Sequence, residues 1–117
     1  MDEQFYPELI RGLPEVDINW PGLRGWALIS KDGQAVFMEC DQETRVGDHS
    51  HGAQFGVVLR GSLELTIEGE TQKLKPGDSY SIPAGAVHSA ILSPGFNAID
   101  VFEETDRYKI KERQASE

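Results

Sequence analysis

The sequence is poor in cysteine, in positive charge and in long apolar segments, and each shortage excludes a class of protein. Cys40 is the single cysteine, so no disulfide can form within the chain and nothing indicates an oxidising compartment. Against 20 Asp and Glu there are 11 Lys and Arg, and the formal net charge is −9. This balance argues against nucleic acid or an anionic membrane surface as a partner.

The chain also lacks the segments that direct a protein into or across a membrane. No stretch approaches the roughly 20 apolar residues of a membrane span. The start, MDEQFYPELI, is acidic and mixed, whereas a signal peptide begins with basic residues and continues with an apolar run. We therefore expect a cytoplasmic protein.

What the sequence does hold is a series of short segments typical of β-strands, separated by turns. Its 117 residues suit one domain. Residues 1–24 predict an N-terminal arm with a short strand or turn around DINWPG, residues 25–103 predict the domain itself, and residues 104–117 predict a polar tail with one short helical turn. The regular spacing of some eight strand-like segments predicts an all-β barrel or sandwich. These segments are GWALIS, QAVFMEC, QFGVVLRG, SLELTIEGE, TQKLKPGD, SYSIPAG, AVHSAILS and FNAIDVFEE.

The three histidines are the first candidates for a functional site. His49 and His51 are two residues apart, and on an extended strand such a pair points to the same face. His88 follows 37 residues later, and strands that pair in between can return it to face the others. Imidazole is the commonest metal ligand among side chains. The pair alone leaves two explanations open, a shared metal ion or three unrelated surface histidines.

Two longer patterns around these histidines resemble the motifs of the cupin family. HSHGAQFGVVLRG is similar to the first cupin motif, with Gln54 at the position of an acidic residue and Gly61 at its end. GDSYSIPAGAVH is similar to the second, which ends at His88. The resemblance covers about residues 25–103. It implies a small jelly-roll barrel, the double-stranded β-helix of cupins, and this agrees with the strand count.

The resemblance also implies one divalent metal ion bound by His49, His51 and His88, with Gln54 as the fourth ligand. Zinc, nickel, manganese, ferrous iron and copper all suit such ligands. A glutamine brings no negative charge, so the ion keeps its full +2 and should attract an anionic oxygen ligand such as a carboxylate. The alternative is that Gln54 points away and a water molecule takes its place.

A second cluster follows in NAIDVFEETDRY. Asp100 interrupts an apolar strand, shares a face with Phe102, and is costly to bury without a partner. It either faces the barrel interior, or it faces solvent or pairs with a structural arginine or lysine. The sequence is similar here to small cupins that linearise unsaturated uronates in pectin and alginate breakdown. That resemblance implies catalytic roles for Asp100 and Arg107 and a place for Phe102 in the substrate pocket.

These observations favour an enzyme that acts on a small anionic substrate such as a sugar acid. In this hypothesis the metal is a Lewis acid and Asp100 moves a proton in an isomerisation or ring-opening. A metal-dependent dioxygenase and a non-catalytic cupin that binds a small molecule are the alternatives. The resemblance further implies a homodimer, and the arm before Gly25 carries Phe5, Tyr6 and Trp20 as apolar side chains for its interface.

Overall fold

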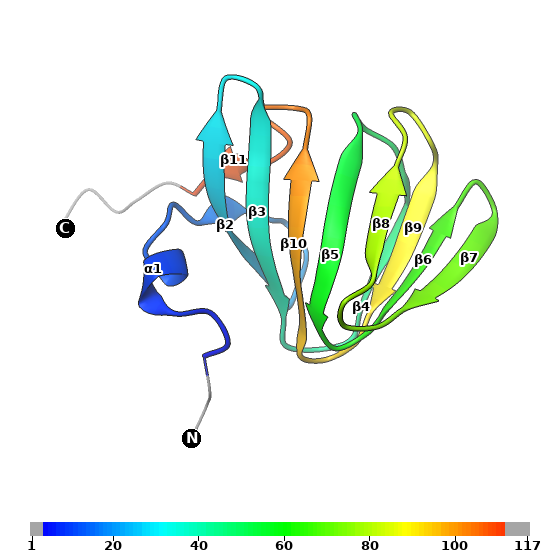
Figure 1. Ribbon diagram of the computed structural model, residues 1–117, viewed down its shortest axis with the longest axis horizontal. Coiled ribbons are helices and arrows are strands. Elements are labelled where there is room, and N and C mark those ends of the chain that lie inside the picture. The colour runs from blue at the N-terminus through cyan, green and yellow to red at the C-terminus, as the bar shows by residue number, and fades with distance from the viewer. Residues whose placement is uncertain (1–3, 112–117) are drawn as a thin grey trace.

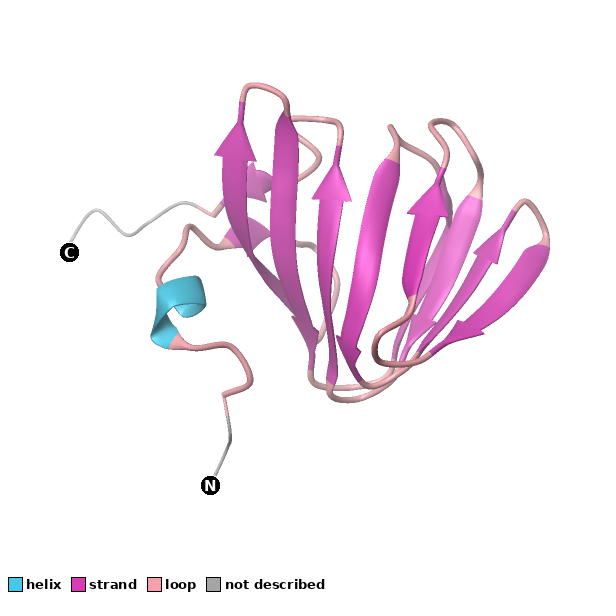
Figure 2. Ribbon diagram, viewed as in Figure 1, coloured by secondary structure: helices cyan, strands magenta, loops and turns pink. Residues whose placement is uncertain are grey.

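The computed structural model describes residues 4–111, and within that range its regular secondary structure is almost entirely β-strand (Figure 2). One short helix, α1 (Glu8–Arg11), precedes the strands. The strands are β1 (Val16–Asp17), β2 (Leu23–Ser30), β3 (Gly33–Cys40), β4 (Thr44–His49), β5 (Gln54–Arg60), β6 (Leu63–Ile67), β7 (Glu70–Leu74), β8 (Ser79–Ile82), β9 (His88–Leu92), β10 (Phe96–Phe102) and β11 (Lys109–Ile110). The predicted all-β class is confirmed. In the described range no helix has the length and apolar character needed to cross a membrane.

Two antiparallel sheets form the body of the molecule (Figure 1). The five-stranded sheet has the order β2-β3-β10-β5-β8, and the four-stranded sheet has the order β4-β9-β6-β7. Val58 and Ala98 from the first sheet share one buried core with Leu65 and Leu92 from the second. This arrangement confirms the jelly roll, with the two sheets packed against each other rather than hydrogen bonded into one closed ring.

The inward face of the five-stranded sheet follows from the period of two along its strands. In β3 the buried residues alternate with half-buried ones, and Gln34 and Val36 both point inward. In β10 the inward positions include Asp100 and Phe102. Asp100 pairs in register with Val36 on one side and Gly56 on the other. A carboxylate therefore lies in the middle of the inner face of this sheet, next to an apolar side chain and a glycine.

Turn chemistry sets the ends of the strands. The hairpin predicted at residues 31–33 joins β2 to β3. Gly61 and Gly77 of the two motifs have φ values of 76° and 95°, which glycine adopts at little cost. At Gly61 a Cβ atom would also lie 2.8 Å from the Phe96 Cα atom.

The segments outside the two sheets differ in part from expectation. The arm holds helix α1, which the sequence pattern did not predict, and β1 near the expected strand. In residues 104–111, the described part of the tail, the chain forms turns and β11 instead of a helical turn, and residues 112–117 lie outside the described range. β1 pairs with β11, so a segment from the arm and a segment from the tail lie side by side.

Candidate metal centre

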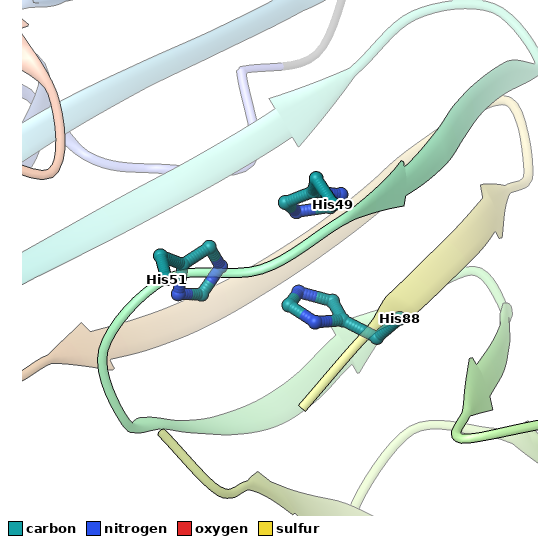
Figure 3. Close-up of side chains that lie close together, drawn as sticks. All are labelled: His49, His51 and His88. Atoms are coloured by element: carbon teal, nitrogen blue, oxygen red, sulfur yellow. The ribbon is translucent and has the colours of Figure 1, made fainter. Parts of the chain in front are cut away.

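The three histidines lie together where β4 ends and β9 begins (Figure 3). His49 is the last residue of β4 and pairs in register with His88, the first residue of β9. His51 belongs to the loop after β4 rather than to the strand itself, yet its ring centroid is 5.3 Å from that of His49. One ligand nitrogen from each ring lies within 4.8 Å of the other two. The chain thus brings together the three residues that the motifs predicted.

The chemistry of the three rings fits a divalent metal ion. Each Nδ1 atom lies at hydrogen-bond distance from a backbone carbonyl oxygen: 2.8 Å for His49, 2.8 Å for His51 and 3.0 Å for His88. Because a carbonyl only accepts, each Nδ1 carries the proton and each Nε2 keeps a lone pair for a metal. Burial lowers the pKa of His51 and of His88, which favours the neutral rings that bind metals.

One atom in particular lacks a protein partner. The Nε2 atom of His51 is buried, and within residues 4–111 nothing forms a hydrogen bond with it. A buried polar atom without a partner is costly, and a metal ion would satisfy it. The three histidines could therefore hold one ion.

Backbone contacts fix the loop between His51 and Gln54. Gly85 of the second motif donates its N–H to the carbonyl oxygen of His51 at 2.8 Å. Ala53 donates its N–H to the Glu103 carboxylate at 2.9 Å, and the Glu103 N–H donates to the Ala53 carbonyl at 3.0 Å. The loop is thus held by both the second motif and the end of β10.

Asp100 is a buried carboxylate with two hydrogen-bond donors. Tyr80 donates its hydroxyl to the Asp100 Oδ1 atom at 2.6 Å, and Gln54 donates its Nε2 amide to the same oxygen at 2.8 Å. The amide nitrogen of Gln54 is therefore occupied, and its carbonyl oxygen is the atom left to face a cation. Burial raises the pKa of Asp100 to about 6, although both hydrogen bonds and the charge of Arg107 act in the opposite direction.

Tyr80 is the residue that sequence reasoning missed. It is 6% exposed, and burial together with the Asp100 carboxylate raises its pKa, so the phenol keeps its proton and is the donor. Gly56 leaves the room for this pair, because a Cβ atom there would collide with both side chains. The available signal was the alternation of SYSI, in which Tyr80 and Ile82 point inward and the two serines are exposed.

Arg107 and Phe102 complete one wall. Phe102 is buried, with its ring centroid 5.6 Å from that of His51. The Arg107 guanidinium carbon lies 4.3 Å from the centroid of the Tyr108 ring and 5.5 Å from that of Phe102. The Nε atom of Arg107 is buried and has no partner in the described chain. An unpaired guanidinium between aromatic rings is suited to an anion.

All seven residues predicted for the site line one inner cavity of about 90 Å³. They are His49, His51, Gln54, His88, Asp100, Phe102 and Arg107. The cavity combines a metal-ligand set, a buried carboxylate and one cation.

The architecture of the molecule is that of known proteins. A family model described as a cupin domain matches residues 36–93. The structure of KdgF from Halomonas sp. is 30% identical in sequence and superimposes with a TM-score of 0.68, covering 76% of this chain and 89% of that one. The chain belongs to the cupin superfamily. The resemblance inferred from the two motifs is thereby confirmed.

Other similar proteins agree on the fold of this cupin. An RmlC-like cupin from Shewanella frigidimarina superimposes with a TM-score of 0.73 at 24% identity, covering 91% of this chain and 95% of that one. Mannose-1-phosphate guanylyltransferase ManC of Salmonella typhimurium is 38% identical over 55 residues. The matched segment is 47% of this cupin and only 11% of that much longer enzyme.

Proposed function

We propose that this cupin is a metal-dependent enzyme that isomerises a small sugar acid, such as an unsaturated uronate, by opening its ring. The observation that carries the proposal is the composition of the inner cavity. Asp100 is 4% exposed and lines the same cavity as the three histidines and Arg107. Perturbed titratable groups that converge in a cavity are typical of active sites.

The roles of the binding residues follow from their chemistry. His49, His51 and His88 would hold the ion through Nε2, with the Gln54 carbonyl oxygen as a fourth ligand. When bound, the ion supplies Lewis acidity toward a substrate oxygen. Arg107 would pair with the substrate carboxylate, because its buried Nε atom has no hydrogen-bond partner within residues 4–111 and a guanidinium forms strong charge-assisted hydrogen bonds. Phe102 forms the apolar wall that keeps water from this end of the cavity.

Asp100 would move the proton. Ring-opening of an unsaturated uronate is a net isomerisation in which the anomeric hydroxyl loses a proton and the bond between the anomeric carbon and the ring oxygen breaks. The anomeric carbon becomes an aldehyde, and the enolate that remains takes a proton on its alkene carbon to become a ketone. One carboxylate can accept the first proton and return it, so no other reactant is required.

The cavity favours this proposal over a purely binding role. A cupin that only binds a small anion gains nothing from a carboxylate inside its pocket, because the two negative charges repel. Asp100 is such a group: its hydrogen-bond donors are the neutral side chains of Tyr80 and Gln54, and the charge of Arg107 offsets the effect of burial on its pKa only in part. Its burial supports a role in proton transfer.

The test is an Asp100→Asn variant. Asparagine keeps the shape of the side chain but cannot take a proton, so we expect turnover to fall by about 10²–10⁴-fold with metal content and thermal midpoint unchanged. Loss of the ultraviolet absorbance of the alkene conjugated to the carboxylate measures turnover. The control is Asp32→Asn in the exposed turn between β2 and β3, which should keep parental activity.

Two outcomes of this test decide between the hypotheses. An Asp100→Asn variant as active as the parent would contradict the proposal and favour the binding module. Turnover that disappears when oxygen is removed would favour the dioxygenase, because ring-opening consumes no oxygen.

A further inference from the structure

The inner cavity is too small to hold a whole sugar acid. Its volume of about 90 Å³ is far below the roughly 300–1,000 Å³ of clefts that bury small ligands. A second chamber of about 540 Å³ adjoins it. The two spaces share six lining residues, namely Leu23, Val46, His49, His51, Arg107 and Tyr108. A sugar acid that reaches Arg107 and Asp100 cannot fit wholly in the inner cavity, so part of its ring must extend into the outer chamber.

The N-terminal arm forms one side of this outer chamber through Ile18, Asn19 and Trp20. The Trp20 side chain is 41% exposed, and its Nε1 atom donates a hydrogen bond to the Arg45 carbonyl oxygen at 3.0 Å. The indole is thus held in place while much of its surface stays open. A fixed, half-exposed aromatic ring in a cleft is suited to contact with a ring-sized group of a ligand.

The outer chamber shares its cationic side chain with the inner cavity. Arg107, at the junction, is the one cationic residue among the described residues that line the chamber, and Asp48 contributes a carboxylate. Asn19 and Ser50 add neutral polar groups. The chamber therefore suits an uncharged body that can accept and donate hydrogen bonds, and a second carboxylate there would meet Asp48 without a cation.

We propose that this outer chamber binds the uncharged, ring-sized body of a monocarboxylate, with Trp20 as the surface on which the ring lies. The inference rests on the proposed function in one respect, because it takes Arg107, beside the ion that the three histidines would hold, to bind the carboxylate. It assigns the arm a role in choosing the substrate. An acid with one carboxylate and a ring should bind more tightly than a small acid without a ring, such as acetate, and more tightly than an oligouronate.

The experiment measures binding to the zinc-loaded full chain by calorimetry with three probes. Glucuronate has one carboxylate and a ring, acetate has a carboxylate without a ring, and digalacturonate has a second carboxylate. Glucuronate also lacks the alkene, so its binding is independent of turnover. We expect glucuronate to bind at least tenfold more tightly than acetate.

The variants test each part of the chamber. Trp20→Ala should reduce the ratio of the acetate Kd to the glucuronate Kd by about three- to tenfold, and Trp20→Phe should restore most of it, because an aromatic ring remains.

Asp48→Asn should tighten digalacturonate binding by about two- to fivefold, as expected for an exposed charge. The matched control is Phe5→Ala, since Phe5 is an aromatic residue of the same arm at 37% exposure and lies outside the chamber lining.

Each outcome bears on one claim. A Trp20→Ala variant with the parental ratio, or a parent that binds glucuronate no better than acetate, would overturn the inference even if the protein turned over a uronate. A cyclohexane carboxylate that binds as tightly as glucuronate would show that the ring is recognised through its apolar surface, which supports the inference and identifies an apolar body. A protein that shows the predicted ratios but no turnover would overturn the proposed enzyme alone.

Discussion

At the residue scale, the hydrogen bonds of Asp100 determine which of its oxygens is available for chemistry. Tyr80 and Gln54 both donate to Oδ1, and no donor within residues 4–111 reaches Oδ2. The two donors also fix the rotation of the carboxylate, because they hold the same atom from two directions. Oδ2 is therefore the atom that we expect to take the proton.

Replacing Tyr80 by phenylalanine tests this arrangement. The variant removes one donor to a buried carboxylate and leaves the ring in the core, so we expect kcat to fall by about tenfold while the metal content stays the same. Steady-state kinetics on the uronate measures the loss. Tyr6→Phe is the matched control, because the Tyr6 hydroxyl is also buried and donates a hydrogen bond to the Met38 carbonyl oxygen at 2.7 Å, but Tyr6 does not line the cavity. Equal kcat values in Tyr80→Phe and the parent would show that Tyr80 has no part in catalysis.

The residues found from sequence and the residue missed differ in a physical way. His49, His51 and His88 are recognisable because a metal requires particular ligands at particular spacings. Asp100 is recognisable because a charge within an apolar strand needs a reason. Tyr80 carries no such mark, since a buried tyrosine is common in a core and its partner lies 20 positions away in the sequence.

At the scale of elements, a buried glutamine positions the segment that carries Arg107. Gln34 on β3 is 1% exposed. Its side-chain amide donates to the carbonyl oxygens of Tyr108 at 2.8 Å and of Thr105 at 3.3 Å, and its Oε1 atom accepts the N–H of Tyr108 at 3.2 Å. These bonds hold the turn after β10 against the sheet, with Arg107 beside the cavity.

A Gln34→Leu variant should separate anion binding from metal binding. Leucine removes all three hydrogen bonds and leaves buried backbone groups unpaired, so we expect the free energy of unfolding to fall by about 1–3 kcal/mol. We also expect acetate to bind the zinc-loaded protein about tenfold more weakly, with one zinc per chain retained. Gln72→Leu on the exposed strand β7 is the control. Unchanged acetate binding would show that Gln34 does not position Arg107.

The strands found from the sequence carry an alternating pattern, an apolar run or a turn signal at their ends. β3 and β10 alternate between buried and open positions or carry long apolar runs, and both were predicted. β4 was not singled out, because TRVGDH buries a single residue and has no apolar period. β1 and β11 have two residues each, too few for any period, and their pairing depends on contacts between opposite ends of the chain.

At the scale of the whole molecule, the pairing of β1 with β11 assembles the mouth of the site from both ends of the chain. β1 is followed by Ile18 and Trp20, and β11 is preceded by Arg107 and Tyr108. The Lys111 N–H donates to the Glu15 carbonyl oxygen at 2.8 Å, and the two side chains form an ion pair at 3.2 Å. The pairing of β1 with β11 thus brings the residues after β1 and the residues before β11 to the same outer chamber.

The homodimer remains a prediction, and the surface indicates where a second copy would bind. Tyr6 is buried within its own chain, so of the three apolar residues predicted for the interface Phe5 and Trp20 stay partly open. Apolar side chains with a higher exposed fraction lie on the outer face of the five-stranded sheet, where Leu28 is 53%, Phe55 is 47% and Val101 is 45% exposed. Apolar surface of this kind favours association.

Light scattering tests the assembly. At micromolar concentration we expect twice the mass of one chain for the parent. Phe55→Glu places a charge among the exposed apolar side chains of the five-stranded sheet and should give the mass of a single chain. The control is Glu64→Gln on β6 of the other sheet, which should leave the dimer intact. A parent that scatters as a monomer would contradict the predicted homodimer.

The metal centre is the claim on which the account depends, and X-ray diffraction near the absorption edge of the bound metal tests it most directly. The measurement locates the ion and identifies the element in crystals of the full chain. We expect one anomalous peak per chain, about 2.0–2.2 Å from the Nε2 atoms of His49, His51 and His88. A peak at any other group of residues, or no peak after saturation with zinc and dialysis, would contradict the account.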